Sequence, residues 1–430
     1  MALLVAATGD ALAQEPPQPS PEVPGYPLPV APTAPDDDED DEGAPESVAP
    51  QEPVAHPMSG AIRTGIYADG DQTYVFRVLG AIAAAFNRWT VSGSVSADVV
   101  SSASVDVRSS PGLSKVDVVS SASGTTSTSG GTMTDRRFQV TGGLGWKDDD
   151  GHAVNFSASF ANERDYNSVG GGFNGSIDVF HRMTTLLGGI RFTGNFIGSV
   201  LDPTFSQRMV DLGWSAGVAQ VLSRKDALRL RYDGGYSDGY QASPYRNVRF
   251  GDWRFTVGDY QHIIFSNTIG SADGLPETVP ATRLQHALVL EWLHSLLPGL
   301  GLHTEARLGI DSWGMKSATG ALDLRTASGQ WRVEVGYRFY IQSSADFYQS
   351  KYTLAPSNYS YFTSDKELGR ETGHVAHLDV SRVLLPSRRP GGASLLFDGR
   401  LTGMYYTYPD FVLLGSRAGI FLDLGFTWEN

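Results

Sequence analysis

The residues of this chain that could do chemistry are a serine between glycines and two neighbouring histidines. Gly213–Gly217 (GWSAG) matches the G-x-S-x-G pattern of hydrolases, in which the serine stands on a strained turn from a strand to a helix. Here the segment lies inside a predicted strand, where small residues leave room on the inner face. His374 and His377 are three residues apart, so a strand would send them to opposite faces and one metal ion could not bind both. We therefore expect no catalytic residue, no metal site and no cofactor.

Composition excludes further kinds of site, membrane segment and partner. The chain has no cysteine, which excludes thiolate metal sites and disulfide bonds. It has no run of apolar residues long enough for a transmembrane helix, which needs about 18 or more. Residues 14–56 contain eleven acidic residues and no Lys or Arg, and they account for most of the net charge of -14. Since the remainder is near neutral, no nucleic-acid partner is expected.

Charged residues elsewhere alternate with apolar ones, which indicates strands. In Trp331–Gln342 (WRVEVGYRFYIQ) the odd positions are all apolar or aromatic, and most even positions are polar. Successive strand side chains point to opposite faces, so this segment has one apolar and one polar face. It is long for an edge strand of a soluble β-sandwich, the alternative, whereas about 9–11 tilted residues cross a bilayer. The pattern favours a transmembrane strand.

The same pattern recurs along the chain and predicts an all-β, antiparallel transmembrane β-barrel of sixteen strands. The predicted strands are 60–68, 72–86, 88–103, 135–147, 152–165, 169–181, 183–197, 207–222, 226–239, 282–296, 300–311, 313–326, 330–342, 372–385, 392–406 and 414–428.

The connections between these strands give an independent test. The long ones, 104–134, 240–281 and 343–371, all follow odd-numbered strands, whereas those after even-numbered strands are short. Outer-membrane barrels have short turns at the periplasmic end and long loops outside. The parity supports the strand count and predicts the orientation.

If the apolar faces contact lipid, the charged faces line a lumen. An Arg on the lipid side at the bilayer centre would cost about 2–4 kcal/mol. Charges of both signs would either pair along the wall and hold a water-filled channel open, or anchor loops folded inward as a plug. The predicted lumen residues are Arg191, Asp211, Arg229, Arg231, Asp233, Glu305, Arg307, Arg332, Glu334, Arg338, Asp398, Arg400, Arg417 and Asp423.

The N-terminal region differs from the rest in composition. Met1–Ala13 resembles the end of a secretory signal peptide, with an A-x-A-like site at Ala11–Ala13. Residues 14–57 are rich in proline and acidic residues, which predicts a disordered linker that reaches into the periplasm. Residues 58–430 form the predicted outer-membrane barrel.

Several loop motifs stand out. DVVSSAS occurs twice, at 98–104 and 117–123, and either represents a serine-rich loop or places a small polar site at the outer mouth. Ser243–Arg246 (SPYR) suits a fixed turn more than a flexible tip. The loop-motif candidates are Asp98, Ser101, Asp117, Ser120, Pro244, Tyr245, Arg246, Asp346 and Tyr348.

Together with Glu163–Ser168 (ERDYNS), Met183–Leu186 (MTTL) and above all Tyr337–Tyr348 (YRFYIQSSADFY), these motifs resemble a Gram-negative family of outer-membrane barrels, domain-of-unknown-function 3570. The resemblance spans roughly Ile62 to the C-terminus. It implies the fold and the outer-membrane location but no activity. Some relatives are encoded near flavin-transferring and thioredoxin-like proteins, which implies a role beside an envelope redox system.

We expect a porin-like channel in outer-membrane lipid that passes small polar or anionic solutes. One alternative is a non-conducting binding or assembly module that recruits an envelope protein through its long loops and acidic linker. A second alternative is an enzyme embedded in the barrel, which would need Ser, Asp or His side chains converging near the mouth.

Overall fold

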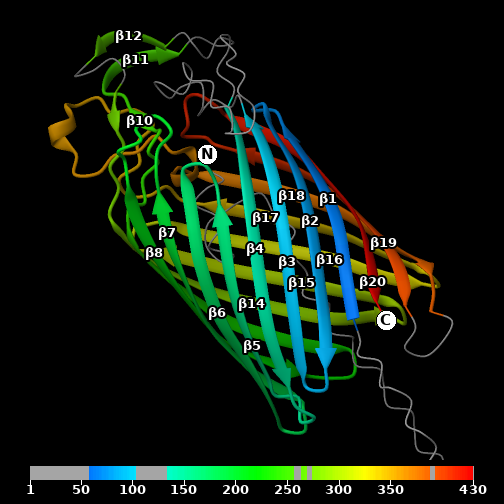
Figure 1. The fold of residues 1–430 in the computed structure, drawn as a ribbon. Coiled ribbons are helices and arrows are strands. Elements are labelled where there is room, and N and C mark those ends of the chain that lie inside the picture. Colours follow the sequence, from blue (N-terminus) through cyan, green and yellow to red (C-terminus); the bar gives the residue numbers. More distant parts are fainter. Residues whose placement is uncertain (1–57, 103–132, 256–262, 269–273, 388–392, 430) are drawn as a thin grey trace, which may run out of the picture.

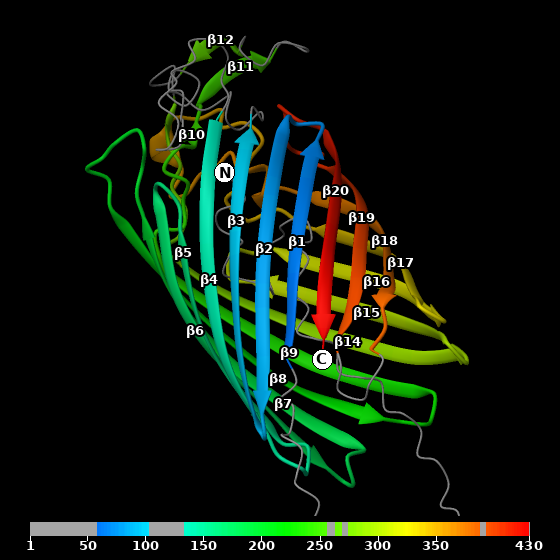
Figure 2. The same ribbon diagram turned by 45° about the vertical axis from the view of Figure 1, so that its right-hand side comes forward.

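The computed structural model describes residues 58–102, 133–255, 263–268, 274–387 and 393–429. Sixteen antiparallel strands form a closed barrel in which each strand pairs with its neighbours along the chain (Figure 1). The last strand pairs with the first, from Ser59 opposite Glu429 to Asp69 opposite Gly419, and Figure 2 shows the two side by side. The predicted sixteen-stranded antiparallel transmembrane barrel is confirmed. The signal-peptide and linker predictions lie outside the described residues.

The wall strands are β1 (Met58–Asp69), β2 (Thr73–Phe86), β3 (Trp89–Ser102), β4 (Met133–Lys147), β5 (Ala153–Asn162), β6 (Tyr166–Val179), β7 (Thr184–Ile197), β8 (Gln207–Val221), β9 (Asp226–Gly239), β14 (Thr282–Leu297), β15 (Leu300–Asp311), β16 (Lys316–Ser328), β17 (Trp331–Gln342), β18 (Glu371–Leu385), β19 (Ser394–Thr407) and β20 (Ser416–Glu429). Among the described residues, no helix is long and apolar enough to span a lipid bilayer.

Alternating exposure along each strand defines an outer and an inner face. On β20, Leu422 and Leu424 are exposed on the outer face, whereas Asp423 between them is 3% exposed and lies inside. Exposed large apolar side chains recur in the same way along the wall strands. A soluble protein rarely exposes an apolar surface of this extent, so the outer face is built to contact lipid.

The two ends of the barrel differ. At one end, which we call the turn end, the connections are short; the turn between β16 and β17 contains Gly329, whose φ of +58° suits glycine. At the other, the loop end, residues 240–281 and 343–370 form the long connections. The predicted loop 104–134 falls largely in residues 103–132, outside the described residues.

The long loops contain short elements of their own: β10 (Asn247–Val248), β11 (Gly251–Phe255), β12 (Ile263–Thr268), β13 (Leu275–Pro276) and the 3-10 turns η2 (Pro356–Asn358) and η3 (Lys366–Leu368). β10 pairs with β13 and β11 with β12. The β11–β12 pair lies above the barrel in Figure 1. Phe250, Tyr352 and Phe362 pack together and join the two loops. We call the described parts of 240–281 together with 343–370 the loop cap.

At two turns the strand boundaries differ from the prediction for local reasons. The chain turns tightly at residues 163–165, where the Glu163 backbone amide donates to the Tyr166 carbonyl at 2.7 Å, so β5 ends early and β6 starts early. Residues 313–315 form a turn rather than strand, because Asp311 Oδ1 accepts the amides of Trp313 and Met315, each at 2.9 Å.

Candidate functional site

The inner face of the barrel carries the densest set of functional side chains. The fourteen residues predicted to line the lumen all lie on strand positions opposite to the apolar outer face. Arg191, for example, stands between Ile190 and Phe192, which are 58% and 53% exposed on the outside. The GWSAG segment lies within β8, so Ser215 does not stand on the strand-to-helix turn that a nucleophile elbow needs.

Most of these charges are held in ion pairs along the wall. Asp233 forms ion pairs with both Arg231 and Arg307, at 3.0 and 2.9 Å. Arg63 lies 3.8 Å from Asp398 and 3.6 Å from Asp423, across the seam where the barrel closes. Such pairing lets the wall keep many charged groups in a confined, partly desolvated space.

Asp211 and Arg417 are also engaged. Asp211 accepts hydrogen bonds from Asn195 and Ser237, at 2.6 and 2.5 Å. Arg417 lies 3.9 Å from Asp69 and is flanked by the Tyr406 ring near the loop end.

One row of charges continues across seven strands, from β9 to β19. Arg229 pairs with Glu291, and His303 links Glu291 to Asp323, at 3.8 and 2.9 Å. Asp323 then faces His377 at 3.7 Å. The row ends where Arg400 donates two hydrogen bonds of 2.5 Å to Asp379, 3.9 Å from His377. We call this row the carboxylate–histidine belt; its members are Arg229, Glu291, His303, Asp323, His377, Asp379 and Arg400.

Four predicted lumen residues have no ion pair within 4.0 Å in the described part of the chain: Arg191, Glu305, Arg332 and Arg338. Three of these four residues are arginines.

The sequence prediction missed the five belt residues between Arg229 and Arg400, which are Glu291, His303, Asp323, His377 and Asp379. The alternation contained the signal: Asp323 stands between Leu322 and Leu324 as Arg231 stands between Leu230 and Tyr232. The alternation does not show which strands pair, and it is this pairing that brings these side chains together. His374, by contrast, lies on the outer face, where Nδ1 is 2.7 Å from the Tyr337 hydroxyl.

The loop motifs lie mostly at the loop end and hold the loops in place. The Tyr245 hydroxyl donates to Asp165 and accepts the Val200 amide at 2.8 Å, which ties the SPYR turn to the ERDYNS turn. Pro244 lies within this turn, in which the Arg246 amide donates to the Ser243 carbonyl at 3.4 Å.

The end of the YRFYIQSSADFY segment also packs into the loop end. The Asp346 amide donates to the Trp313 carbonyl at 2.9 Å, and Tyr348 is buried beside Trp313 and Met315. The segment thus fastens the loop after β17 onto the turn between β15 and β16.

Of the DVVSSAS repeat, only the first copy falls partly in the described region. Asp98 is buried and accepts two hydrogen bonds from Arg77, at 2.7 and 3.2 Å, and Ser101 lies on β3 opposite Tyr74 and Thr134. Asp117 and Ser120 lie outside the described residues. The first copy is therefore a strand end whose aspartate is already paired.

The loop cap has a charged centre. Glu277 is 6% exposed and accepts the Thr363 hydroxyl at 2.7 Å and the Ser243 amide at 2.5 Å. Arg246 joins Glu277 to Asp365, at 3.2 and 2.7 Å. Burial raises the pKa of Glu277, while the Arg246 guanidinium acts against that shift. The cap is an ordered structure tied through its interior.

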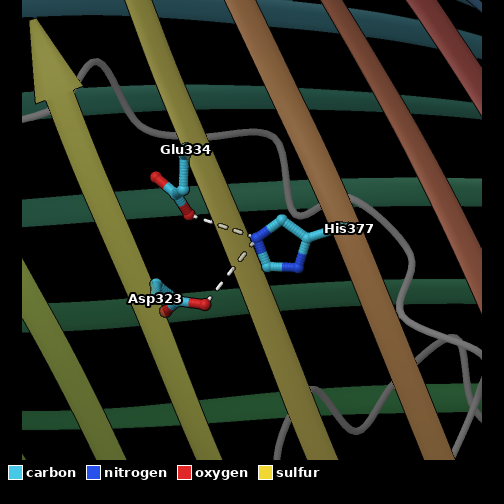
Figure 3. Close-up of side chains that lie close together, drawn as sticks. All are labelled: Asp323, Glu334 and His377. Carbon is cyan, nitrogen blue, oxygen red and sulfur yellow. Dashed lines mark hydrogen bonds and ion pairs between the residues drawn. The ribbon is translucent and has the colours of Figure 1, made fainter.

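Two clusters of described residues bring three metal-ligating side chains together: Asp323 with Glu334 and His377, and Asp135 with Glu163 and Asp165. The first belongs to the inner wall and the second to the loop end. Figure 3 shows the first, in which the three side chains point toward one another from adjacent strands.

Residues 201–384 match the model of a family described as protein of unknown function (DUF3570), which confirms the resemblance seen in the motifs. No curated protein gives a significant match in sequence.

Among solved structures, the ferric enterobactin receptor PfeA of Pseudomonas aeruginosa is similar at 12% identity and a TM-score of 0.41, over 81% of this chain and 53% of the receptor. This chain thus spans about half the length of that receptor. A bacterial polysaccharide outer-membrane secretin is similar at 8% identity and a TM-score of 0.43, over 86% of this chain and 97% of the secretin. The CymD monoaromatic hydrocarbon channel is similar at 8% identity and a TM-score of 0.38, over 88% of this chain and 89% of the channel.

Proposed function

We propose that this outer-membrane barrel is a pore for small polar or anionic solutes, with the loop end at the cell surface and the turn end in the periplasm. The observation that carries the proposal is the inner face: it presents charged groups along the described strands, and three of the predicted lumen residues there, Arg191, Arg332 and Arg338, are arginines with no ion pair within 4.0 Å in the described part of the chain. A barrel of about sixteen strands encloses more space than side chains fill, so a charged lining is hydrated. Fixed positive charge in such a space raises the local concentration of anions.

Planar-bilayer recording tests the proposal. The purified chain should conduct, and its reversal potential in a KCl gradient should show a preference for chloride. Exchanging Arg332 and Arg338 for Gln should lower that preference without closing the pore. The matched control is Arg382→Gln, which removes an arginine from the outer face, where it stacks on Trp331 at 4.8 Å. A folded chain that never conducts contradicts the proposal.

The ordered loop cap favours a second function, a binding or assembly module for an envelope protein. Aromatic packing and a buried ionic centre fix the shape of the cap, as a recognition surface requires. The resemblance to the unknown-function family suggests a redox partner. This candidate predicts that an envelope protein co-purifies with the chain and is lost when residues 14–56 are deleted; an unchanged preparation after deletion counts against a role for the linker.

A further inference from the structure

A glycine on β17 lets side chains from two non-adjacent strands meet. Asp323 on β16 and His377 on β18 are both register partners of Gly336, one on each side. Strands separated by one strand lie about 9–10 Å apart, and a side chain on the middle strand normally fills the space between them. A Cβ at Gly336 would lie 2.1 Å from His377 Cε1 and 2.2 Å from Asp323 Oδ1. The two functional groups therefore occupy the space that glycine leaves open.

Glu334, two residues away on the same face of β17, completes a group of three ligand-type atoms (Figure 3). His377 Nε2 lies 3.3 Å from Glu334 Oε1 and 3.7 Å from Asp323 Oδ1, and the three atoms are all within 4.8 Å of one another. Ligands about 2.0–2.2 Å from a tetrahedral Zn²⁺ stand about 3.3–3.6 Å apart. Small rotations of the side chains would bring all three atoms to that spacing.

The remaining oxygen of each carboxylate is already held. Asp323 Oδ2 is 2.9 Å from His303 Nδ1, and Glu334 Oε2 is 2.5 Å from Arg325 Nε. Oδ1 and Oε1 are directed at the imidazole, and Oε1 also accepts a hydrogen bond from Arg325 Nη2 at 3.3 Å. Ligands oriented by outer hydrogen bonds in this way are typical of metal sites. The three side chains are 13–19% exposed, so the group opens to the lumen.

We propose that Asp323, Glu334 and His377 bind one divalent transition-metal ion of the zinc class on the lumen wall, with the remaining coordination positions open to water or a passing solute. A site with one imidazole and two carboxylates suits Zn²⁺ and its neighbours better than Ca²⁺ or Mg²⁺, which prefer oxygen ligands alone. The proposal does not depend on whether the barrel conducts. The competing explanation is an ion pair in which a protonated His377 bridges two carboxylates and binds no metal.

The test is titration of the full chain in detergent with Zn²⁺ against a chromophoric chelator, after far-UV circular dichroism has shown that each variant is folded. His377→Gln removes the imidazole. Gly336→Ala keeps all three ligands and fills the space between them. The controls are His374→Gln, which removes an imidazole from the outer face of the same strand, and Gly320→Ala on β16, where an added Cβ meets nothing within 4 Å.

The expected result is one tight Zn²⁺ site per chain in the wild type and both controls, weakened more than about 100-fold in His377→Gln and Gly336→Ala, since loss of an outer partner alone costs about 10–100-fold. X-ray absorption at the zinc edge should show one imidazole nitrogen, absent in His377→Gln. Equal Zn²⁺ affinity of the wild type and His377→Gln overturns the proposal and assigns any bound metal to other acidic groups. A wild type that binds no Zn²⁺ establishes the ion pair instead.

Discussion

At the scale of single residues, Glu163 is a strongly perturbed group outside the membrane-spanning strands, in the turn between β5 and β6. Its side chain is 6% exposed and lies 3.6 Å from Arg137. Burial, followed by the nearby Asp135 carboxylate, raises the pKa of Glu163 to about 8, and Arg137 acts against this shift. Burial also raises the pKa of Asp165 in the same turn. The folded loop end therefore keeps bound protons that the unfolded chain would release.

This difference predicts a pH dependence of stability. The folded pKa of Glu163 lies above its ordinary value of 4.5, so the stabilisation it contributes is complete below about 4.5 and is lost as pH rises through about 8. The free energy of unfolding should fall by up to about 1.4 kcal/mol per pH unit over that interval. Thermal unfolding of wild type and Glu163→Gln at pH 5.5 and 8.5 checks this. The substitution should flatten the pH dependence; parallel profiles for the two proteins would show that Glu163 does not carry it.

At the scale of elements, Glu277 and Arg246 connect the two loops of the cap. Arg246→Gln would leave the buried Glu277 charge without its nearest cation, which costs about 3–5 kcal/mol when the remaining charge stays buried. We expect the cap to open locally while the barrel stays folded. Hydrogen exchange of backbone amides in 343–370 measures this opening.

Two matched variants make that measurement specific. Arg370→Gln breaks the exposed pair with Asp410 and should leave exchange nearly unchanged. Exchanging Glu277 for Gln together with Arg246→Gln removes the buried charge and should restore much of the protection. If the single and double variants exchange equally fast, the ionic centre is not what holds the cap.

How far the sequence predicts these elements depends on the distance over which a pattern acts. The sixteen strands and the parity of the loops are predictable because alternation with period two and turn length are local properties. The cap was not predictable, because Glu277 and Arg246 meet Thr363 and Asp365 from a different loop. The group around Gly336 contains one predictable and one unpredictable pairing. A short turn sets the pairing of Asp323 with Gly336, whereas a long loop separates Gly336 from His377 and leaves their register open.

At the scale of the whole molecule, every statement about the lumen depends on which face of the wall contacts lipid. Val335 is 53% exposed, and its register partners on both sides, Leu324 and Leu378, are exposed as well. Ala321 on β16 faces inward, with Glu305 and Arg338 as its register partners. The two positions lie on neighbouring strands but on opposite faces of the same wall.

An arginine placed at each position separates a membrane barrel from a soluble one. In lipid vesicles, Val335→Arg should lower the free energy of unfolding by about 2–4 kcal/mol, because the guanidinium enters the hydrocarbon region. Ala321→Arg should stay within about 1 kcal/mol of wild type, because its charge enters a hydrated lumen beside Glu305. Equilibrium denaturant titration in vesicles measures both. If the two variants unfold alike, or if Ala321→Arg is the more destabilised, the apolar face is not the lipid face, and neither the pore nor the metal site on its wall has the surroundings that its chemistry requires.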